Sequence, residues 1–439
     1  MRGRKLLAVA GAVTALSVGI AACGSDDDST SGDSTSGSSA VVGGEETLDL
    51  KIGNILSLSG DLADYGPSGE KASDIAVSEI NKSIEETGAD HTVTATTEDD
   101  QTSDQAGVQA ARKVAGEGAT CITGSYASSV TIPIARSVSI REGILQISPA
   151  STSDEITGLE DNGLLNRTAP PDSLQGPTLA NAIADDLGGA DGKTVNIGAR
   201  NDSYGTGLAG TFSDAWEALG GTIGEEVIYD PEQPSYDSEA DQITSGSPDA
   251  TVIIDFPETF AKVGPALVRT GNFDASTTWG TDGLASGDVA AQGGDDYEGF
   301  RGTAPGSPDK EEAATAFDEL FNSSDPTDVD RNTFDAQNFD ATILCYLSAV
   351  AAGSTEGADM AAQLSGVSSP PGDEYSWEEL PAAVEALQNG EDIDYVGASG
   401  GVDIDEAGDA TAGVYDIYEF KGGDIAITGE VPIATGDDS

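Results

Sequence analysis

The chain has 439 residues, with 19 Lys and Arg against 78 Asp and Glu, and a formal net charge of −59 at pH 7. This length exceeds one ordinary domain, so we expect two substantial hydrophobic cores. A surface this acidic repels a nucleic-acid backbone along almost every face, so no nucleic-acid partner is expected. The acidity is most simply a solubility property, and it also fits a salty habitat or a GC-rich genome.

Residues 1–22 are typical of a secretory signal, with a positively charged start and a short apolar run over 6–20. The run is too short, and wrongly flanked, for a transmembrane helix. An Ile-Ala-Ala sequence precedes Cys23 and resembles the lipobox of bacterial lipoproteins, whose cysteine is lipidated and becomes the new N-terminus. The alternative is an ordinary secretory signal with an incidental cysteine. Residues 23–47 are rich in Gly, Ser and Asp and predict an acidic flexible tether. We therefore expect a lipid-anchored protein at the outer face of the cytoplasmic membrane.

Strand and helix patterns alternate along most of the remaining chain. Apolar spacing predicts strands at 50–58 and 91–100 and helices around 72–80 and 103–118. The stretch Cys121–Thr157 adds two short strands with a helix between them. This alternation is typical of a parallel sheet covered by helices on both faces.

The alternation breaks at consecutive prolines within 167–173 and then starts afresh, and 301–307 resembles a second crossing. We therefore predict an α/β protein with two doubly wound parallel-sheet lobes joined by a hinge of several crossings. The first lobe is expected to comprise 48–168 and 303–400, and the second lobe 169–302 and 401–439.

Small and hydroxyl-bearing residues follow the two strands within Cys121–Thr157. Parallel strands deliver Ser128, Ser129, Ala150 and Thr152 to the same sheet edge, where ligands bind in open α/β sheets. These loops hold no histidine and no cysteine pair, so we expect hydrogen-bond donation and no catalysis. Ser128 and Ser129 are predicted to cap the following helix and to present backbone N–H groups to an anion. The alternative is capping alone.

Three aromatic residues and one acid also follow predicted strands. Tyr65, Tyr204 and Phe256 are placed to wall an aliphatic ligand, and the alternative for each is ordinary packing. Asp282 is a lone carboxylate at a strand end, where it is placed to neutralise a ligand ammonium.

Other motifs are weaker. Residues 205–210 match the GxGxxG pattern, but five residues separate the strand from the first glycine, so we interpret them as a loop closing on a pocket and expect no cofactor. His91 is the one histidine, and we expect it on the surface, far from any nucleophile. No HExxH or CxxC spacing indicates a metal, although Asp-rich loops leave calcium open. Cys121 and Cys345 either form a disulfide or remain two buried thiols.

An ordered series of segments resembles the type I periplasmic binding proteins of the leucine/isoleucine/valine-binding family. The series covers Leu48 to Gly302 well and the rest loosely. Its members are KIGNILSLSGDLADYGPSG, EDDQTSDQAGVQAARKV, ITGSYASSVTIPIA, GILQISPASTSDEIT, NRTAPPDSLQGPTLA and NDSYGTGLA.

The resemblance implies a binding site for an amino acid. It assigns the ligand carboxylate to Ser128, Ala150 and Thr152 and the ammonium to Asp282. Tyr65, Tyr204 and Phe256 would shape the side-chain pocket or the closing lobe. Phe256 replaces a tyrosine of that family, and Asp282 replaces a longer glutamate, so these two departures imply a somewhat different ligand.

The resemblance further implies a monomeric solute-binding lipoprotein of an ABC importer, with a membrane permease as its partner and no enzymatic activity. A ligand-sensing receptor module of the same fold is the alternative, and the acidic tail without a second apolar span favours transport. A secreted hydrolase is a remote alternative, because no nucleophile–base pair is evident.

Overall fold

The computed structural model describes residues 47–308 and 311–433. The predicted signal peptide, Cys23 and the tether up to residue 46 lie outside the described residues. Within the described ranges, no helix combines the length and the apolar character needed to cross a membrane.

The first lobe contains a five-stranded parallel sheet in the order β2-β1-β3-β4-β5. β3 and β4 are buried along their whole length, as expected for parallel strands with helices on both faces. The strands are β1 (Leu48–Leu56), β2 (His91–Asp99), β3 (Cys121–Thr123), β4 (Leu145–Ser148) and β5 (Leu165–Arg167).

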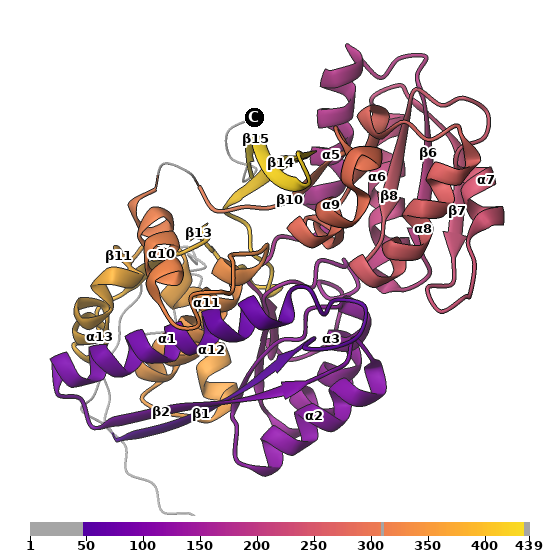
Figure 1. Cartoon of the computed structure of the whole chain (residues 1–439). Helices are drawn as coiled ribbons and strands as arrows, with labels where there is room; N and C mark the ends of the chain where they lie inside the picture. Colours follow the sequence, from indigo (N-terminus) through magenta and orange to yellow (C-terminus); the bar gives the residue numbers. More distant parts are fainter. Residues whose placement is uncertain (1–46, 309–310, 434–439) are drawn as a thin grey trace, which may run out of the picture. The chain divides into compact units, whose positions relative to one another are not determined.

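Helices cover both faces of this sheet (Figure 1). α1 and α11 pack together on one face, and α2 packs with α3 on the other. Nearly every residue of α11 is buried, including the polar residues of its first half. The bounds are α1 (Gly66–Thr87), α2 (Asp104–Gly116), α3 (Ser128–Ile134), α4 (Ile140–Glu142), α10 (Glu312–Ser323), α11 (Asp335–Ala352), α12 (Gly357–Ser368) and α13 (Leu380–Gln388). A small sheet of β11 (Asp373–Ser376), β12 (Ile393–Gly397) and β13 (Gly400–Gly401) completes the lobe.

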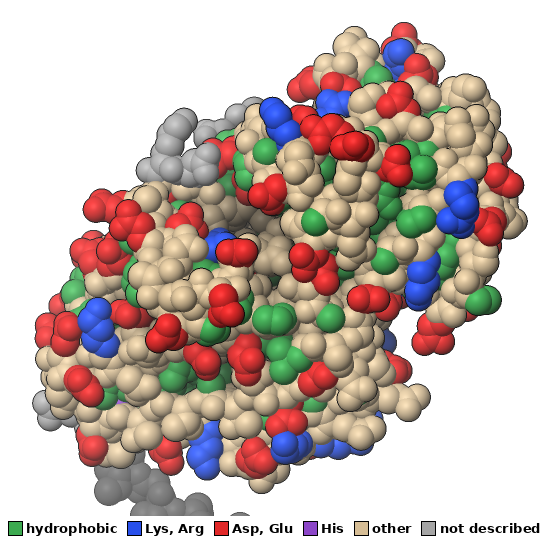
Figure 2. Space-filling view, viewed as in Figure 1, with side chains coloured by type: hydrophobic (Ala, Val, Ile, Leu, Met, Phe, Trp, Pro, Cys, Tyr) green, Lys and Arg blue, Asp and Glu red, His purple; other side chains and the backbone are tan. Residues whose placement is uncertain are grey.

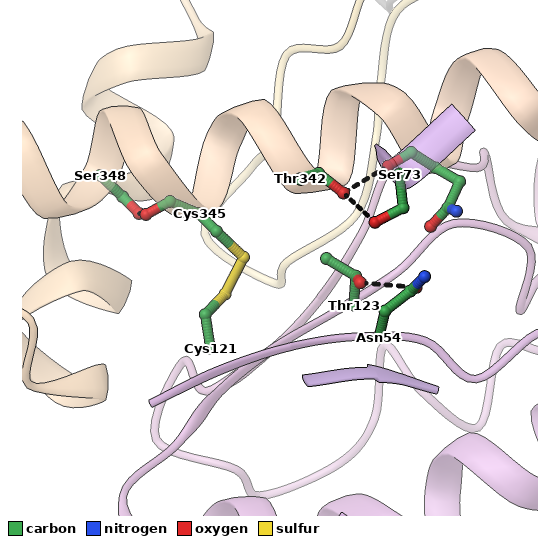
Figure 3. The surroundings of a disulfide bond; sticks show 8 residues. Asn54, Ser73, Cys121, Thr123, Thr342, Cys345 and Ser348 are labelled. Carbon is green, nitrogen blue, oxygen red and sulfur yellow. Dashed lines mark hydrogen bonds between the residues drawn. A yellow bond between two sulfur atoms is a disulfide. The ribbon is translucent and has the colours of Figure 1, made fainter. Parts of the chain in front are cut away.

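A disulfide joins Cys121 of β3 to Cys345 of α11, with a Cα–Cα distance of 6.1 Å (Figure 3). Both cysteines are fully buried. The structure therefore selects the disulfide from the two states that the sequence leaves open. The bond fixes the strand that leads into the Ser128 loop to the central helix of the lobe.

The second lobe contains a seven-stranded sheet in the order β15-β14-β10-β9-β8-β6-β7. The five strands β6 to β10 run parallel, and the hairpin β14–β15 adds two antiparallel strands beside β10. The strands are β6 (Thr194–Arg200), β7 (Thr222–Tyr229), β8 (Ala250–Ile254), β9 (Thr278–Gly280), β10 (Arg301–Pro305), β14 (Val414–Lys421) and β15 (Asp424–Pro432). The helices are α5 (Asp172–Leu187), α6 (Ser203–Ala218), α7 (Asp237–Ile243), α8 (Pro257–Thr270) and α9 (Gly287–Gly293).

Both lobes use the same strand order. Taken in chain order, the parallel strands of each lobe run 2-1-3-4-5, so each sheet has a switch point between its first and third strands. Chain connections diverge there and leave a crevice at the carboxyl ends of the strands. The predicted doubly wound α/β class is thus confirmed. β10 lies wholly in the second sheet, including Thr303 to Pro305, which the sequence assigns to the first lobe.

The expectation that His91 lies on the surface is wrong. Its side chain is buried, and its Nδ1 lies 2.9 Å from the Tyr346 hydroxyl oxygen of α11. The physical reason is the pleat of β2, which places His91 on the same buried face as Val93. This histidine therefore joins β2 to the core of the first lobe.

A candidate ligand-binding cavity

A small cavity lies where the strand-following loops of the two lobes meet. Its volume is about 10 Å³, roughly the room of one water molecule. Nine residues line it, and none is Lys or Arg: Leu62, Tyr126, Ser128, Ala150, Tyr204, Phe256, Asp282, Gly283 and Phe334. Most of them follow the carboxyl end of a parallel strand, which is the position that both switch points favour.

The cavity brings together five of the eight predicted site residues, namely Ser128, Ala150, Tyr204, Phe256 and Asp282. The other three, Tyr65, Ser129 and Thr152, are not among the lining residues.

Tyr65 and Thr152 lie in the layer behind the lining, and both are buried. The Tyr65 hydroxyl donates a hydrogen bond of 3.2 Å to the Asp282 backbone carbonyl, so this ring contacts both lobes. The Thr152 backbone carbonyl accepts a hydrogen bond of 2.8 Å from the Asp172 backbone N–H. Ser129 is half-buried on α3.

The predicted capping role of Ser128 and Ser129 is wrong. α3 begins at Ser128 itself, its N-cap is Ala127, and no side chain caps it. The Ser128 hydroxyl instead accepts the Ser153 backbone N–H at 3.3 Å and so joins the loops after β3 and β4.

Hydroxyl groups bind the first-lobe loops to one another. The Ser125 carbonyl accepts hydrogen bonds from the Ser148 and Ser151 hydroxyls at 2.6 and 3.3 Å. The Ser151 hydroxyl also lies 2.7 Å from Thr131 Oγ1. The Ser125 hydroxyl donates to the buried carboxylate of Asp100. This wall is therefore held rigidly by contacts within its own lobe.

Asp282 supplies a carboxyl group to the cavity from the turn after β9. Its Oδ1 accepts hydrogen bonds from the Tyr204 hydroxyl and from Gln175 Nε2, each at 2.8 Å. The side chain is almost fully buried, and burial raises the pKa of Asp282 to about 6, although these hydrogen bonds favour the ionised form. A buried carboxyl group without a basic side chain beside it is suited to meet a cationic group of a ligand.

Asp172 is a second buried acid near Asp282, and the sequence reasoning missed it. Its side chain is fully buried, and the Thr152 side chain is the hydrogen-bonding group that favours its ionised form. Burial, reinforced by the charge of Asp282, raises the pKa of Asp172 well above its usual range. Asp172 is one of 78 acidic residues and directly follows two prolines, so no signal in the sequence distinguished it.

The second-lobe wall is aromatic. The rings of Tyr204 and Phe256 stack with centroids 5.1 Å apart and an interplanar angle of 14°. Gly283 lies against them, and a Cβ there would lie 2.4 Å from the Asp255 carbonyl oxygen and 2.9 Å from Phe256 Cδ1. Only glycine therefore allows this turn to approach the rings closely.

The segment 205–210 is helical, so its prediction as a loop closing on a pocket is wrong. α6 begins at Ser203, and the Asp202 side chain caps it by accepting the Gly205 backbone N–H at 2.9 Å. The helix places Tyr204 in its first turn, facing the cavity. The sequence signal that could have revealed this helix start is the Asp at the N-cap position, followed by small residues.

Four lining residues were also missed, one of them Gly283 of the turn described above. Leu62 and Tyr126 lie within segments that the sequence singled out, one in the loop after β1 and one beside Ser128. Phe334 precedes α11 with a positive φ of 73°, and its ring meets Tyr65 and Tyr126 edge-on at 6.0 and 6.1 Å. No pattern in the sequence marked Phe334.

A larger cavity of about 820 Å³ adjoins the small one, and Phe334 lines both. Acids dominate the charged residues around it: Asp64, Asp288, Asp318, Asp328, Asp330, Asp416 and Asp424, against the single base Arg331. Acidic side chains also outnumber basic ones over the face in Figure 2. An anionic solute is disfavoured near this cavity. The described residues contain no cluster of three or more His, Cys, Asp or Glu side chains placed to hold a metal ion.

Comparison with known proteins agrees with this architecture. A family model described as periplasmic binding protein matches residues 49–373. The chain belongs to this family of solute-binding proteins, in its type I, leucine/isoleucine/valine-binding branch. It is 29% identical over 385 residues to Leu/Ile/Val-binding protein BraC3 of Rhizobium johnstonii, covering 86% of this chain and 93% of that protein.

Solved structures share the fold. The leucine-binding protein LivK of Thermotoga maritima matches with a TM-score of 0.72 and 22% identity, covering 89% of this chain and 100% of that one. LivJ of Streptococcus pneumoniae, in complex with isoleucine, matches with a TM-score of 0.70 and 17% identity over 88% and 99% of the two chains. A solute-binding protein of R. palustris in complex with benzoate has a TM-score of 0.67 and 19% identity over 89% and 98%. The shared fold therefore accommodates both amino acids and aromatic acids.

Proposed function

We propose that this protein is the extracytoplasmic solute-binding component of an ABC importer and that it binds a zwitterionic amino acid, or a closely related small solute, between its lobes. The observation that carries the proposal is Asp282, a buried carboxyl group lining a cavity that has no basic side chain. A membrane permease, which receives the solute from the closed protein, is the proposed partner of a monomeric chain. The name of the BraC3 relative supports the branched-chain amino acid class.

The two walls fit the two ends of a zwitterion. The ligand ammonium meets Asp282, and the ligand carboxylate meets the small-residue wall at Ser128 and Ala150, with Thr152 in the layer behind them. Both charges are then compensated away from water, which a buried ion requires. An aromatic acid such as benzoate has no ammonium group, so it would leave Asp282 uncompensated. Amino acids are therefore favoured over the benzoate ligands of some structural neighbours.

Binding requires the lobes to separate, because a cavity of about 10 Å³ cannot hold an amino acid. We place the hinge close to the boundaries predicted from the sequence, with 48–168 and 303–400 in the first lobe and 169–302 and 401–439 in the second, except that all of β10 belongs to the second lobe. Closing of two lobes around a ligand by a hinge is a common transition. The hydrogen bond from the Tyr65 hydroxyl to the Asp282 backbone carbonyl is a contact that closing would form.

A ligand screen tests the proposal. Free amino acids, amides, urea and aromatic acids are added separately, and unfolding is followed by thermal shift, with calorimetry on each hit. A ligand present at 100 times its Kd adds about 2.7 kcal/mol to the free energy of unfolding. At least one zwitterionic amino acid is expected to bind more tightly than any aromatic acid. A screen in which no zwitterion shifts the transition rejects this ligand class.

Binding without turnover is the proposed activity. A bound amino acid recovered after prolonged incubation should be chemically unchanged by mass spectrometry. Release of a modified product would instead indicate an enzyme.

We further propose that Cys23 carries the lipid anchor, on the strength of the signal-like residues 1–22 that precede it. In the wild-type chain expressed in its membrane, the protein should sediment with membranes and its N-terminal peptide should carry a diacylglyceryl mass. Cys23→Ser should release the protein into the soluble fraction. Equal membrane association of the two proteins would contradict the anchor.

A further inference from the structure

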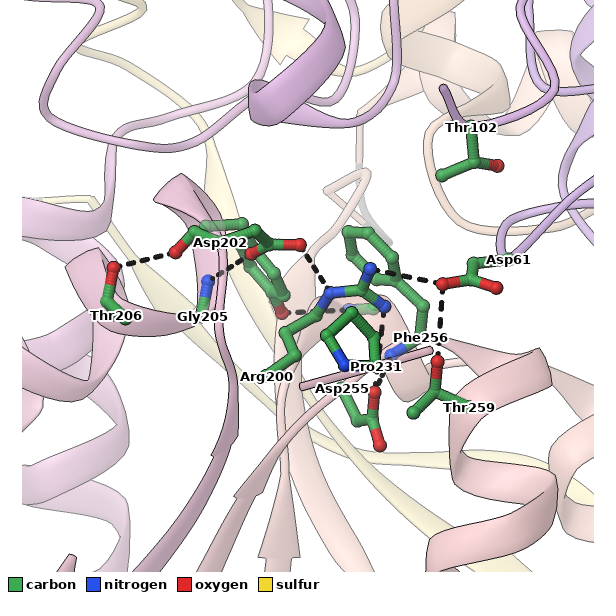
Figure 4. Close-up of polar contacts among 12 residues, drawn as sticks. Asp61, Thr102, Arg200, Asp202, Gly205, Thr206, Pro231, Asp255, Phe256 and Thr259 are labelled. Carbon is green, nitrogen blue, oxygen red and sulfur yellow. Dashed lines mark hydrogen bonds and ion pairs between the residues drawn. The ribbon is translucent and has the colours of Figure 1, made fainter. Parts of the chain in front are cut away.

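Arg200 is the last residue of β6, and its guanidinium is surrounded by three carboxylates (Figure 4). Nε lies 2.5 Å from Asp202 Oδ2, and Nη1 lies 3.6 Å from Asp255 Oδ1. Both of these acids belong to the second lobe. The third contact, from Nη2 to Asp61 Oδ2 at 3.1 Å, reaches the loop after β1 in the first lobe. The Arg200 side chain is only 4% exposed, so its end of this contact is shielded from water.

Asp61 makes two further contacts with the second lobe. Its Oδ2 accepts the Thr259 hydroxyl at 3.2 Å, and its backbone carbonyl accepts the Glu258 N–H at 3.4 Å. Both donors lie in the first turn of α8. The Asp61 side chain is 33% exposed, so it can return to water when the lobes separate.

Arg200 also supports the ligand-facing wall. The central carbon of its guanidinium lies 3.7 Å from the centroid of the Phe256 ring. Phe256 stacks on Tyr204 and lines the cavity. One side chain therefore touches both the aromatic wall and the acid of the opposite lobe.

The two groups of partners behave differently when the lobes separate. Asp202 and Asp255 move with Arg200 because they belong to the same sheet and its loops, whereas Asp61 does not. The contact with Asp61 exists only when the lobes are together, and it is a charge-assisted hydrogen bond between a buried guanidinium and a partly exposed carboxylate. It therefore adds free energy to the closed state alone.

We propose that Arg200 is a positioning residue that joins ligand recognition to lobe closure: it holds Phe256 in the ligand wall and locks the closed lobes through Asp61. This proposal rests on the proposed function for the identity of the ligand. A ligand that orders Phe256 keeps the guanidinium in place for Asp61, and the lock in turn slows the escape of the ligand. Removing the lock acts mainly on the release rate, because the lock forms after the ligand has entered.

The decisive variant is Asp61→Asn, which removes the first-lobe charge and leaves Arg200, its two second-lobe acids and Phe256 unchanged. Asp186→Asn is the matched control. Asp186 pairs with Arg301 at 2.6 Å, and Arg301 lies 4.5 Å over the ring of Trp279, so the control breaks a similar acid–arginine–aromatic group whose members all belong to the second lobe.

Two measurements on the full chain test the proposal. Spin labels at Glu85→Cys on α1 and Leu219→Cys at the end of α6, both exposed positions, report the distance between the lobes. Stopped-flow dilution reports the release rate of an amino acid identified by the screen. Asp61→Asn is expected to shift the ligand-free distance distribution to longer values and to speed release about tenfold. Asp186→Asn should change neither quantity.

Salt provides an additional readout that a merely structural role would not affect. Release from the wild type should speed up between 0.05 and 0.5 M salt, and release from Asp61→Asn should respond less, because screening weakens the charge pair that the variant already lacks. The proposal would be overturned if Asp61→Asn showed the same distance distribution and the same release rate as the wild type. If no solute binds the wild type, the proposed function fails, and the ligand-free distance comparison still decides whether Asp61 locks the lobes.

Discussion

The two walls of the cavity are built on the same strand order but on different chemistry. In the first lobe, hydroxyls and carbonyls such as those of Ser125, Ser148 and Ser151 bind one another, so most of that wall is already occupied by its own hydrogen bonds. In the second lobe, Phe256 and Asp282 present an aromatic ring and a buried charge to the cavity. The first wall is therefore a rigid surface that holds a small polar group and discriminates little between solutes. The second wall carries the features that distinguish one solute from another.

The largest effect is expected from the charge of the second wall. Asp282→Asn should lower affinity for an amino acid by roughly 100- to 1,000-fold, about 3–4 kcal/mol, because the buried ammonium loses its countercharge. Titration calorimetry measures the change. The same substitution should raise the stability of the ligand-free protein by about 1–3 kcal/mol in urea unfolding, since it removes a carboxylate whose ionisation burial opposes. Unchanged affinity would show that Asp282 is not the ammonium partner.

Changes behind the first wall are expected to alter the stability of the protein and to leave its affinity for the ligand almost unchanged. Replacing Cys121 and Cys345 by serine opens a covalent link across a sequence separation of 224 residues. The free energy of unfolding in urea should fall by about 3 kcal/mol. Affinity at low temperature, where the variant is folded, should stay within about twofold, because the disulfide lies in the core behind the loop. A large loss of affinity in folded protein would mean that the first wall is less rigid than its hydrogen bonds indicate.

The same contrast separates what the sequence predicts from what it does not. Ser128, Ala150, Phe256 and Asp282 were found because parallel strands end at a common edge, and strand patterns are readable from apolar spacing. Asp172 was not found, since burial of one acid among many depends on packing against segments distant in the chain.

Local misreadings had local causes. Tyr204 was expected on a loop because it follows the end of a predicted strand, yet the Asp202 cap starts a helix there. His91 was expected on the surface, although it lies two residues before Val93 and therefore on the same face of the strand. The alternation of apolar and polar residues in β2 thus already indicated that His91 is buried. The pairing of the two cysteines depends on the packing of α11 on β3, which no short-range pattern encodes.

Acid should weaken binding through the second wall. The pKa of Asp282 is about 6 in the ligand-free protein, and an ammonium binds its ionised form. Affinity should therefore fall about tenfold between pH 7 and pH 5. Stability of the ligand-free protein should move in the opposite direction, because a raised folded-state pKa favours the protonated native form and its contribution is lost as pH rises through about 6. Calorimetry across this range on wild type and Asp282→Asn checks both, and the variant should lack the step in affinity.

The smallest effect compares two adjacent serines of the first wall. Ser128→Ala removes a hydroxyl that lines the cavity and should lower affinity about fivefold. Ser129→Ala alters a half-buried position outside the lining and should stay within about twofold. Equal effects of the two substitutions in calorimetry would place the ligand carboxylate elsewhere.

One titration decides whether the carboxyl group of Asp282 holds the ligand ammonium. The amino acid found in the screen and its analogue without the amino group are each titrated into wild type and Asp282→Asn. The wild type should bind the amino acid far more tightly than the analogue, and Asp282→Asn should remove that preference by weakening only the amino acid. If the wild type binds both compounds equally, or if Asp282→Asn keeps the preference, the account of this cavity is contradicted.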